Sequence, residues 1–180
     1  WQQEIVEWAV LRGRCAIFAD CGLGKTFMQL EWARLSGETA LIVAPLSVAR
    51  QTMREASKLD IDAHYIRNGA DVTGPGVWIT NYEMLDKFDA STFDAVVLDE
   101  SSILKNVDGK TRRRLTDQLG KVNARLACTA TPAPNDVAEL CNHAEFLGAM
   151  PRNEMLSAFF VHDEDGWRIK GHATDAMYKW

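Results

Sequence analysis

Short apolar runs alternate with amphipathic segments along this chain. Most of the apolar runs lack polar alternation, which predicts strands that are buried on both faces. They are Cys15–Ala19, Thr39–Ala44, Ala63–Arg67, Val77–Asn81, Ala95–Asp99 and Ala124–Ala130. Helical patterns follow at Thr26–Leu35, Val48–Leu59, Tyr82–Phe88, Lys110–Val122 and Asp136–Leu147. This order predicts an α/β fold with a mainly parallel central sheet, right-handed crossovers and helices on both faces.

The remaining segments set the expected domain limits. Asn68–Gly76 is rich in turn residues and predicts a surface loop, whereas His162–His172 predicts a hairpin or loop after the sheet. The chain has 180 residues, of which 47% are hydrophobic and 25% charged, so we expect a globular domain rather than a disordered segment. We place this domain at residues 1–149 and a helical and loop extension at 150–180.

Charge and cysteine usage limit the partners, metals and cellular compartments that we expect for this chain. The net charge of −5 argues against a large nucleic-acid-coating surface, although a narrow basic track is compatible with it. The four cysteines form no CxxC pair and no Cys/His metal spacing, which favours reduced thiols and no zinc. No apolar run is long enough to span a membrane and no signal-peptide layout is present. We therefore expect a cytoplasmic protein without a membrane partner. The first residue is not Met and the last ones continue a helical pattern, as in a piece of a longer protein.

The stretch ADCGLGKT lies between a predicted strand and a predicted helix. Gly22 and Gly24 permit a tight turn whose backbone N–H groups, with the helix start, attract phosphate. Lys25 can reach the β and γ phosphates of a nucleotide, and the Thr26 hydroxyl can ligate Mg²⁺. The pattern GxxxxGK[ST] is met, except that Ala19 stands in the place of the first glycine. The sequence thus predicts a phosphate-binding loop, with an ordinary strand-to-helix turn as the alternative.

The segment AVVLDESS is an apolar strand that ends in two adjacent carboxylates. Because parallel strands deliver their carboxyl ends to one edge of a sheet, Asp99 and Glu100 are expected beside the phosphate-binding loop. Asp99 can hold Mg²⁺ directly or through water, and Glu100 can orient and deprotonate an attacking water. An acidic pair that caps a helix or faces solvent is the alternative. The upstream loop favours the catalytic interpretation.

Five segments together resemble motifs I, Ia, Ib, II and III of the superfamily-two helicases, in that order. They are DCGLGKT, LIVAPLSVARQTMRE, VWITNYEML, VVLDESSILKN and ACTATPAPND. The resemblance is strongest to Swi/Snf-like DNA translocases, particularly phage and bacterial versions, and extends from Trp1 to about Asp136. It implies the first motor domain of such an enzyme, a three-layer RecA-like P-loop NTPase domain. It also implies hydrolysis of ATP with Mg²⁺ and movement along duplex DNA, with or without strand separation.

The same resemblance implies roles for individual residues. Contacts with the nucleotide are implied for Gln2, Gly22, Leu23, Gly24, Lys25 and Thr26. Catalysis is implied for Lys25, Asp99 and Glu100, and metal binding for Thr26 and Asp99. Coupling between the nucleotide and DNA sides is implied for Thr129 and Thr131. DNA contacts are implied for Pro45, Leu46, Ser47, Arg50, Thr80, Asn81 and Tyr82. Two ordinary alternatives remain: Gln2 as a surface residue that opens a helix, and Ser47 as a helix N-cap.

Other features depart from the family pattern or have ordinary explanations. Ser102 stands where many relatives carry a histidine or aspartate that couples hydrolysis to movement, so this coupling is in doubt while ATP binding is not. The basic stretch Lys110–Arg114 is more typical of a solvated helix face than of a DNA contact. The four histidines have no metal-ligand spacing, and we assign them, like the six tryptophans, to structural or surface positions.

Motors of this family hold ATP between two RecA-like lobes, the second of which donates an arginine finger worth about 10³ to 10⁵ in rate. No second motif set follows Asn135. We therefore expect nucleotide binding with weak or absent turnover from this chain alone, and a second lobe of the same parent chain as its partner. Two other classes stay open. A nucleotide kinase would need an arginine-rich lid that the sequence lacks, and a non-catalytic nucleotide-binding interaction module would explain the short length.

Overall fold

The computed structural model describes residues 1–105, 110–164 and 166–179, the side chains of 110, 111, 178 and 179 apart. The strands are β1 (Arg14–Phe18), β2 (Thr39–Ala44), β3 (Ala63–Tyr65), β4 (Gly76–Asn81), β5 (Ala95–Asp99), β6 (Ala124–Thr129), β7 (Phe160–Asp163) and β8 (Gly166–Ile169). The α-helices are α1 (Gln2–Arg12), α2 (Lys25–Leu35), α3 (Leu46–Lys58), α4 (Lys110–Leu119), α5 (Leu140–Leu147), α6 (Arg152–Phe159) and α7 (Thr174–Lys179). Short 3₁₀ helices are η1 (Gly69–Asp71), η2 (Tyr82–Lys87), η3 (Ala90–Thr92), η4 (Ser101–Lys105) and η5 (Val137–Glu139).

Six strands form one sheet in the order β1-β6-β5-β2-β4-β3, and every pair in it is parallel. The register brings the carboxyl ends of neighbouring strands level, with Phe18 opposite Thr129 and Asp99 opposite Cys128. The loops after β1, β5 and β6 therefore leave the sheet at one edge, next to one another.

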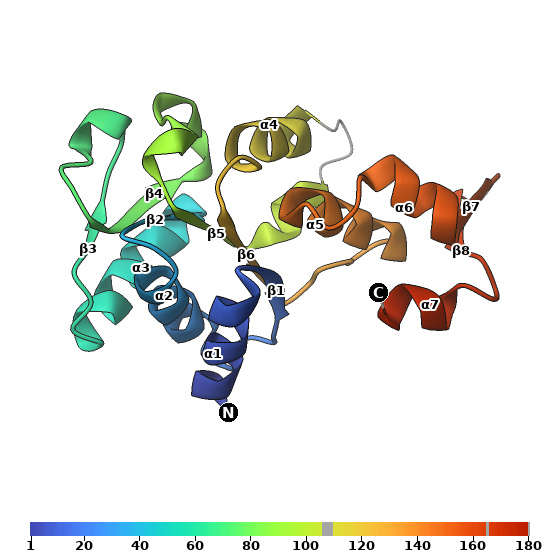
Figure 1. Cartoon of the computed structure of the whole chain (residues 1–180), viewed down its shortest axis with the longest axis horizontal. Helices are drawn as coiled ribbons and strands as arrows, with labels where there is room; N and C mark the ends of the chain where they lie inside the picture. Colours follow the sequence, from blue (N-terminus) through green and yellow to red (C-terminus); the bar gives the residue numbers. More distant parts are fainter. Residues whose placement is uncertain (106–109, 165, 180) are drawn as a thin grey trace.

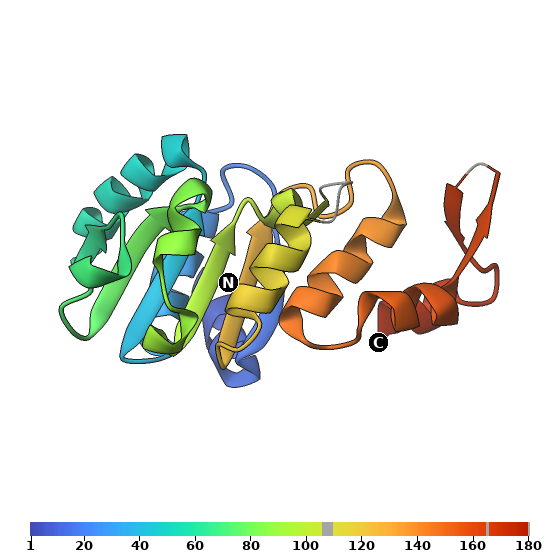
Figure 2. The ribbon, with the colours of Figure 1, turned by 90° about the horizontal axis from the view of Figure 1, so that it is seen from above.

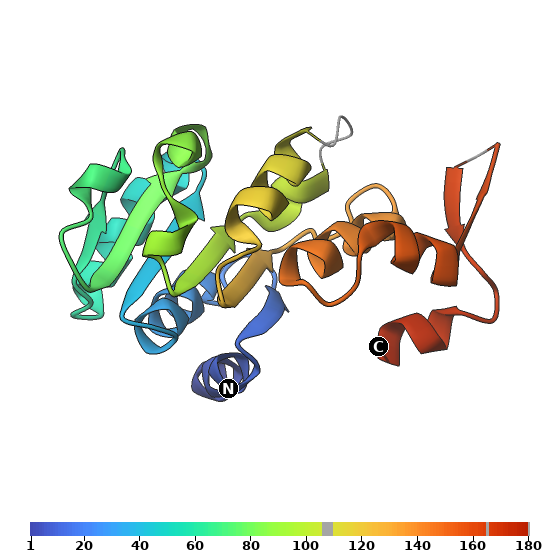
Figure 3. The ribbon, with the colours of Figure 1, turned by 45° about the horizontal axis from the view of Figure 1, so that its top comes forward.

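Two apolar layers cover the sheet because the strand side chains alternate between its faces. On one face, residues of β1, β2, β4, β5 and β6 pack against α1, α2 and α3, with Trp32 wholly buried among them. On the other face the sheet packs against η2, η3, η4, α4 and α5, with Phe146 wholly buried. Figure 3 shows α1 and α2 below the sheet and α4 above it. The result is the predicted three-layer α/β architecture.

The segment after α5 forms a small core of its own. Met155 and Leu156 of α6, Phe160 of β7 and Met177 of α7 bury against residues of η5 and α5. Strands β7 and β8 pair as an antiparallel hairpin, the first of the two alternatives predicted for His162–His172, and it begins earlier, at Phe160. These elements extend away from the sheet on the side of α5 (Figures 1 and 2). No helix among the described residues combines the length and apolar character needed to cross a bilayer.

All six predicted strands of the sheet are present, and two predictions need correction. The strand predicted over Ala63–Arg67 ends at Tyr65. At the next residue, the Ile66 carbonyl accepts a hydrogen bond from the Thr80 hydroxyl at 3.0 Å. The α-helix predicted over Tyr82–Phe88 is instead the 3₁₀ helix η2, whose first turn is capped by the Asn81 side chain. Helix α1 begins at Gln2, upstream of every predicted element.

Candidate nucleotide-binding site

The phosphate-binding loop connects β1 to α2 at the carboxyl edge of the sheet. Gly22 and Gly24 have φ angles of 82° and 80°, in the left-handed region that favours glycine. Gly24 is the N-cap of α2, so the helix begins with Lys25 and directs its first N–H groups toward the loop. Lys25 Nζ donates to the carbonyl oxygens of Ala19 at 2.7 Å and Asp20 at 3.2 Å. The loop thus holds an ammonium group above a helix N-terminus, as an anion site requires.

Helix α1 reaches this loop through Gln2. Its Nε2 donates to the Leu23 carbonyl at 3.1 Å. A Cβ atom built on Gly24 would lie 2.2 Å from the same nitrogen, so only glycine leaves room for this contact. The structure therefore places Gln2 directly over the phosphate-binding loop. This position separates it from an ordinary surface glutamine, although its contact with adenine stays a prediction.

Asp99 ends β5 and is almost completely buried, with 4% of its surface exposed. Its Oδ1 accepts hydrogen bonds from Gln29 Nε2 at 2.7 Å and from the Glu100 N–H at 3.0 Å. Burial raises the pKa of Asp99 above its ordinary value, while the Gln29 hydrogen bond and the nearby Lys25 charge act in the opposite direction. Tyr82 Oη donates to the Asp99 carbonyl at 2.6 Å and fixes the strand end.

Glu100 follows in an unusual backbone conformation. Its φ of 52° places a residue with a Cβ atom in the left-handed region. Thr129 Oγ1 lies 3.4 Å from Glu100 Oε2 and also accepts the Thr131 N–H at 3.1 Å. The acid pair and the two threonines predicted for coupling thus form one connected set at the ends of β5 and β6. Their roles in hydrolysis and coupling remain predictions.

Two hollows lie near α1. The larger, of about 530 Å³, adjoins the phosphate-binding loop, and its lining includes Trp1, Ile5, Trp8, Phe18 and Leu23. It offers an apolar surface of the kind that a nucleobase can cover.

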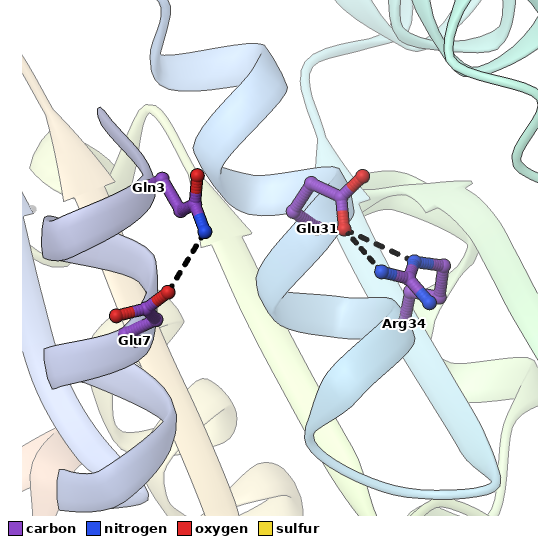
Figure 4. Close-up of polar contacts among 4 residues, drawn as sticks. All are labelled: Gln3, Glu7, Glu31 and Arg34. Atoms are coloured by element: carbon purple, nitrogen blue, oxygen red, sulfur yellow. Dashed lines mark hydrogen bonds and ion pairs between the residues drawn. The ribbon is translucent and has the colours of Figure 1, made fainter. Parts of the chain in front are cut away.

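The second hollow lies between α1 and α2, with Val6, Phe27 and Leu35 in its lining. Its polar side chains already pair within their own helices, as Figure 4 shows. They are Gln3 with Glu7 and Arg34 with Glu31. The first hollow is therefore the candidate for the nucleotide, and its occupancy stays a prediction.

The predicted DNA-contact residues fall into two groups. Leu46, Ser47 and Arg50 are exposed at the start of α3, after the carboxyl end of β2. The N-cap of α3 is Pro45, so the alternative that assigned this role to Ser47 is wrong.

The second group lies inside the protein. Thr80, Asn81 and Tyr82 are all buried, with the Thr80 and Tyr82 hydroxyls bonded to main-chain carbonyls. Asn81 caps η2. Their side chains build the site from within, and their contact with DNA stays a prediction.

The basic stretch before the last strand of the sheet is partly structural. Arg112 pairs with Glu145 of α5 at 2.8 Å in a half-buried setting. Arg114 pairs with Asp86 at 2.6 Å on the exposed surface. The side chains of Lys110 and Thr111 lie outside the described residues. At Arg112 the arrangement favours a packing role over a DNA contact.

Sequence reasoning missed two side chains that the fold brings to the acid pair and to the serine that follows it. Gln29 comes from the interior of α2 and His143 from α5, with its Nε2 3.1 Å from Ser101 Oγ. Within the described part of the chain, no three His, Cys, Asp or Glu side chains gather as a metal cluster. Cys15, Cys128 and Cys141 are buried, and Cys21 in the phosphate-binding loop is exposed.

Comparisons with known proteins agree with this geometry. The family model of the SNF2-related domain matches residues 1–160. A Xenopus tropicalis protein, the SWI/SNF-related matrix-associated actin-dependent regulator of chromatin subfamily A-like protein 1, is 31% identical over 159 residues, which cover 78% of this chain and 16% of that protein. The Bos taurus protein of the same name is 32% identical over 172 residues, covering 84% and 17% respectively.

The fold also matches a solved structure, the Sulfolobus solfataricus SWI2/SNF2 ATPase core in complex with dsDNA. The TM-score is 0.73 at 23% identity, and the match covers 88% of this chain and 38% of that one. The chain therefore spans about a sixth of the length of the two curated relatives and 38% of the solved chain.

Proposed function

The chain belongs to the family of SNF2-related domains, and on this premise we propose that it is the ATP-binding half of an ATP-dependent DNA translocase. The observation that carries the proposal is the meeting of three groups at one sheet edge. Lys25 lies at the N-terminus of α2, in the loop that Gly22 and Gly24 form. Burial raises the pKa of Asp99, which ends β5, and Lys25 lies near enough for its charge to act on that pKa in the opposite direction. Glu100 is the next residue after Asp99. These are the groups that phosphoryl transfer to water requires.

Each side chain has a task that its surroundings support. The loop amides and Lys25 bind the phosphates, and Gln2 stabilises the loop by its hydrogen bond to the Leu23 carbonyl. Glu100, hydrogen-bonded to Thr129, takes the proton of the attacking water. Thr26 and Asp99 would hold Mg²⁺, which when bound neutralises charge on the phosphates. The surroundings fit this ion. Next to Asp99, the buried Oε1 of Gln29 has no hydrogen-bond partner among the described residues, and Mg²⁺ prefers oxygen ligands.

Duplex DNA is the proposed track. The solved relative of the same fold is described as a complex with dsDNA. Pro45, Leu46, Ser47 and Arg50 offer a helix start and a guanidinium at the carboxyl edge of the sheet, which suits a DNA phosphate. We further propose a second RecA-like lobe that completes the ATP site, because the relatives are several times longer than this chain. A phage or bacterial origin rests on the sequence resemblance alone, and the proposed cytoplasmic location rests on the cysteine usage and the short apolar runs of the sequence.

Two substitutions test the nucleotide site. In Lys25→Ala, we expect affinity for a fluorescent ATP analogue to fall about tenfold or more, because a charge-assisted contact with phosphate is lost. Lys58→Ala is the matched control, since Lys58 pairs with Glu55 on the surface of α3. Glu100→Gln should retain nucleotide affinity and block hydrolysis when the second lobe and duplex DNA are present.

The alternatives give other outcomes. A nucleotide kinase would transfer phosphate from ATP to a second nucleotide, which thin-layer chromatography of labelled products detects. If neither Lys25→Ala nor Glu100→Gln altered nucleotide binding or turnover, the chain would be an interaction module and the proposal would fail.

A further inference from the structure

We propose that His143 is a positioning residue for ATP hydrolysis: it holds the loop that carries Glu100 by a hydrogen bond to Ser101. This inference rests on the proposed function. Sequence reasoning assigned His143 to a structural or surface position, and its separation of 42 residues from Ser101 hides the pair from any motif.

The contact lies in the interior. His143 Nε2 and Ser101 Oγ are 3.1 Å apart, and the two residues are 3% and 0% exposed. Phe18, the last residue of β1, packs its ring edge-on against the imidazole with the centroids 5.3 Å apart. Helix α5 contacts β1, β6 and η4. A single side chain of α5 thus touches the end of the strand before the phosphate-binding loop and the turn after the acid pair.

The backbone at Glu100 explains why such a support is needed. Its φ of 52° costs about 1 kcal/mol or more for a residue with a Cβ atom, and it persists only where neighbours hold it. One neighbour on each side does so. Asp99 Oδ1 accepts the Glu100 N–H, and Ser101 is bonded to His143. Without the imidazole, the buried Ser101 hydroxyl would lack a partner among the described residues, at a cost comparable with the strain. The turn would then relax and Glu100 would move.

The imidazole acts by position rather than by proton transfer. Burial lowers the pKa of His143 to about 4, so the ring is neutral at physiological pH. A neutral ring can hold Ser101 without adding charge beside the buried Asp99.

Turnover of the protein that contains this chain and its second lobe tests the role. We expect His143→Leu to lower kcat at least about tenfold with KM for ATP changed less than about twofold, because nucleotide binding does not depend on Glu100. Ser101→Ala should have the same effect, and the double variant should be no worse than either single one. His143→Gln, whose amide reaches the position of Nε2, should recover much of kcat.

Leu119→Ala is the control for stability. Leu119 is buried in α4, away from the acid pair, so its truncation should lower the melting temperature and leave kcat unchanged well below that temperature.

The outcomes separate the two proposals. Wild-type turnover that His143→Leu leaves intact overturns the positioning role alone, as do additive effects of the two substitutions. A wild-type protein that hydrolyses no ATP with DNA present overturns the proposed function and this inference with it.

Discussion

A pair of glycine substitutions tests how Gln2 and the phosphate-binding loop depend on each other. Gly22 and Gly24 have nearly equal φ angles of 82° and 80°, so alanine at either position enters the left-handed region of φ. Their surroundings differ. A Cβ atom on Gly22 meets nothing within 4 Å, whereas one on Gly24 would lie 2.2 Å from Gln2 Nε2. The difference between the two variants therefore isolates the Gln2 contact.

The expected magnitudes follow from this geometry. Gly22→Ala should lower the free energy of unfolding by about 1 kcal/mol, the cost of the left-handed conformation. Gly24→Ala should cost about 0.5 kcal/mol more, because Gln2 must swing away and lose its exposed hydrogen bond to Leu23. For a domain of this size these values correspond to falls in melting temperature of about 3 °C and about 5 °C.

Thermal melts and urea titrations measure both variants, and the fluorescent ATP analogue measures the loop. Removing the clash in Gly24→Ala with a second change, Gln2→Ala, should bring no further loss of stability beyond that of Gly24→Ala. Alanine is used because glycine within α1 would add a helix-propensity cost of its own. In wild type, Gln2→Ala alone should cost about 0.5 kcal/mol, the value of the lost hydrogen bond. Equal losses from Gly22→Ala and Gly24→Ala, with additive effects of Gln2→Ala, would refute the contact.

Three further predictions concern buried charge. Asp99→Asn should raise the melting temperature of the nucleotide-free chain at pH 7, because it removes a buried charge and keeps both hydrogen bonds, and it should abolish any stabilisation by Mg²⁺·ATP. Arg112→Ala should lower the melting temperature more than Arg114→Ala, because the ion pair of Arg114 is exposed. Equal midpoints of the two variants in urea titrations would contradict this. The free energy of unfolding should fall between about pH 6.5 and about pH 4, less so in His143→Gln.

The sequence was sufficient for the parts of the fold that depend on local pattern. Strands that are buried on both faces are recognised in the sequence as continuous apolar runs. The phosphate-binding loop is recognised by two glycines and a lysine within a few positions. Thr80 and Tyr82 show the limit of such reasoning. Their place in a motif suggested an outward contact, and the fold instead turns both hydroxyls onto main-chain carbonyls.

Side chains whose partners are distant in sequence could not be found in this way. Gln29 looks like any polar residue of an amphipathic helix until the fold places it 2.7 Å from Asp99, 70 positions away. His143 lies in a helix whose pattern predicts only packing, and Ser101 looks like a loop residue. Both partnerships exist because the parallel register brings the ends of β1, β5 and β6 together. The spacing of residues in the sequence does not reveal that register.

Burial acts on two titratable groups of this edge, His143 and Asp99, with opposite consequences for acid stability. Burial lowers the pKa of His143 from 6.5 to about 4, so on acidification the unfolded chain takes up a proton before the folded one. Stability present above pH 6.5 is therefore lost toward pH 4, by up to about 3 kcal/mol. Asp99 has the reverse sign. Its raised pKa lets the folded chain bind a proton first, so it adds stability as the pH falls through that pKa toward 3.8. Urea titrations across this range should show a steeper acid loss in Asp99→Asn and a shallower one in His143→Gln; parallel curves for the three proteins would mean that neither group is buried as described.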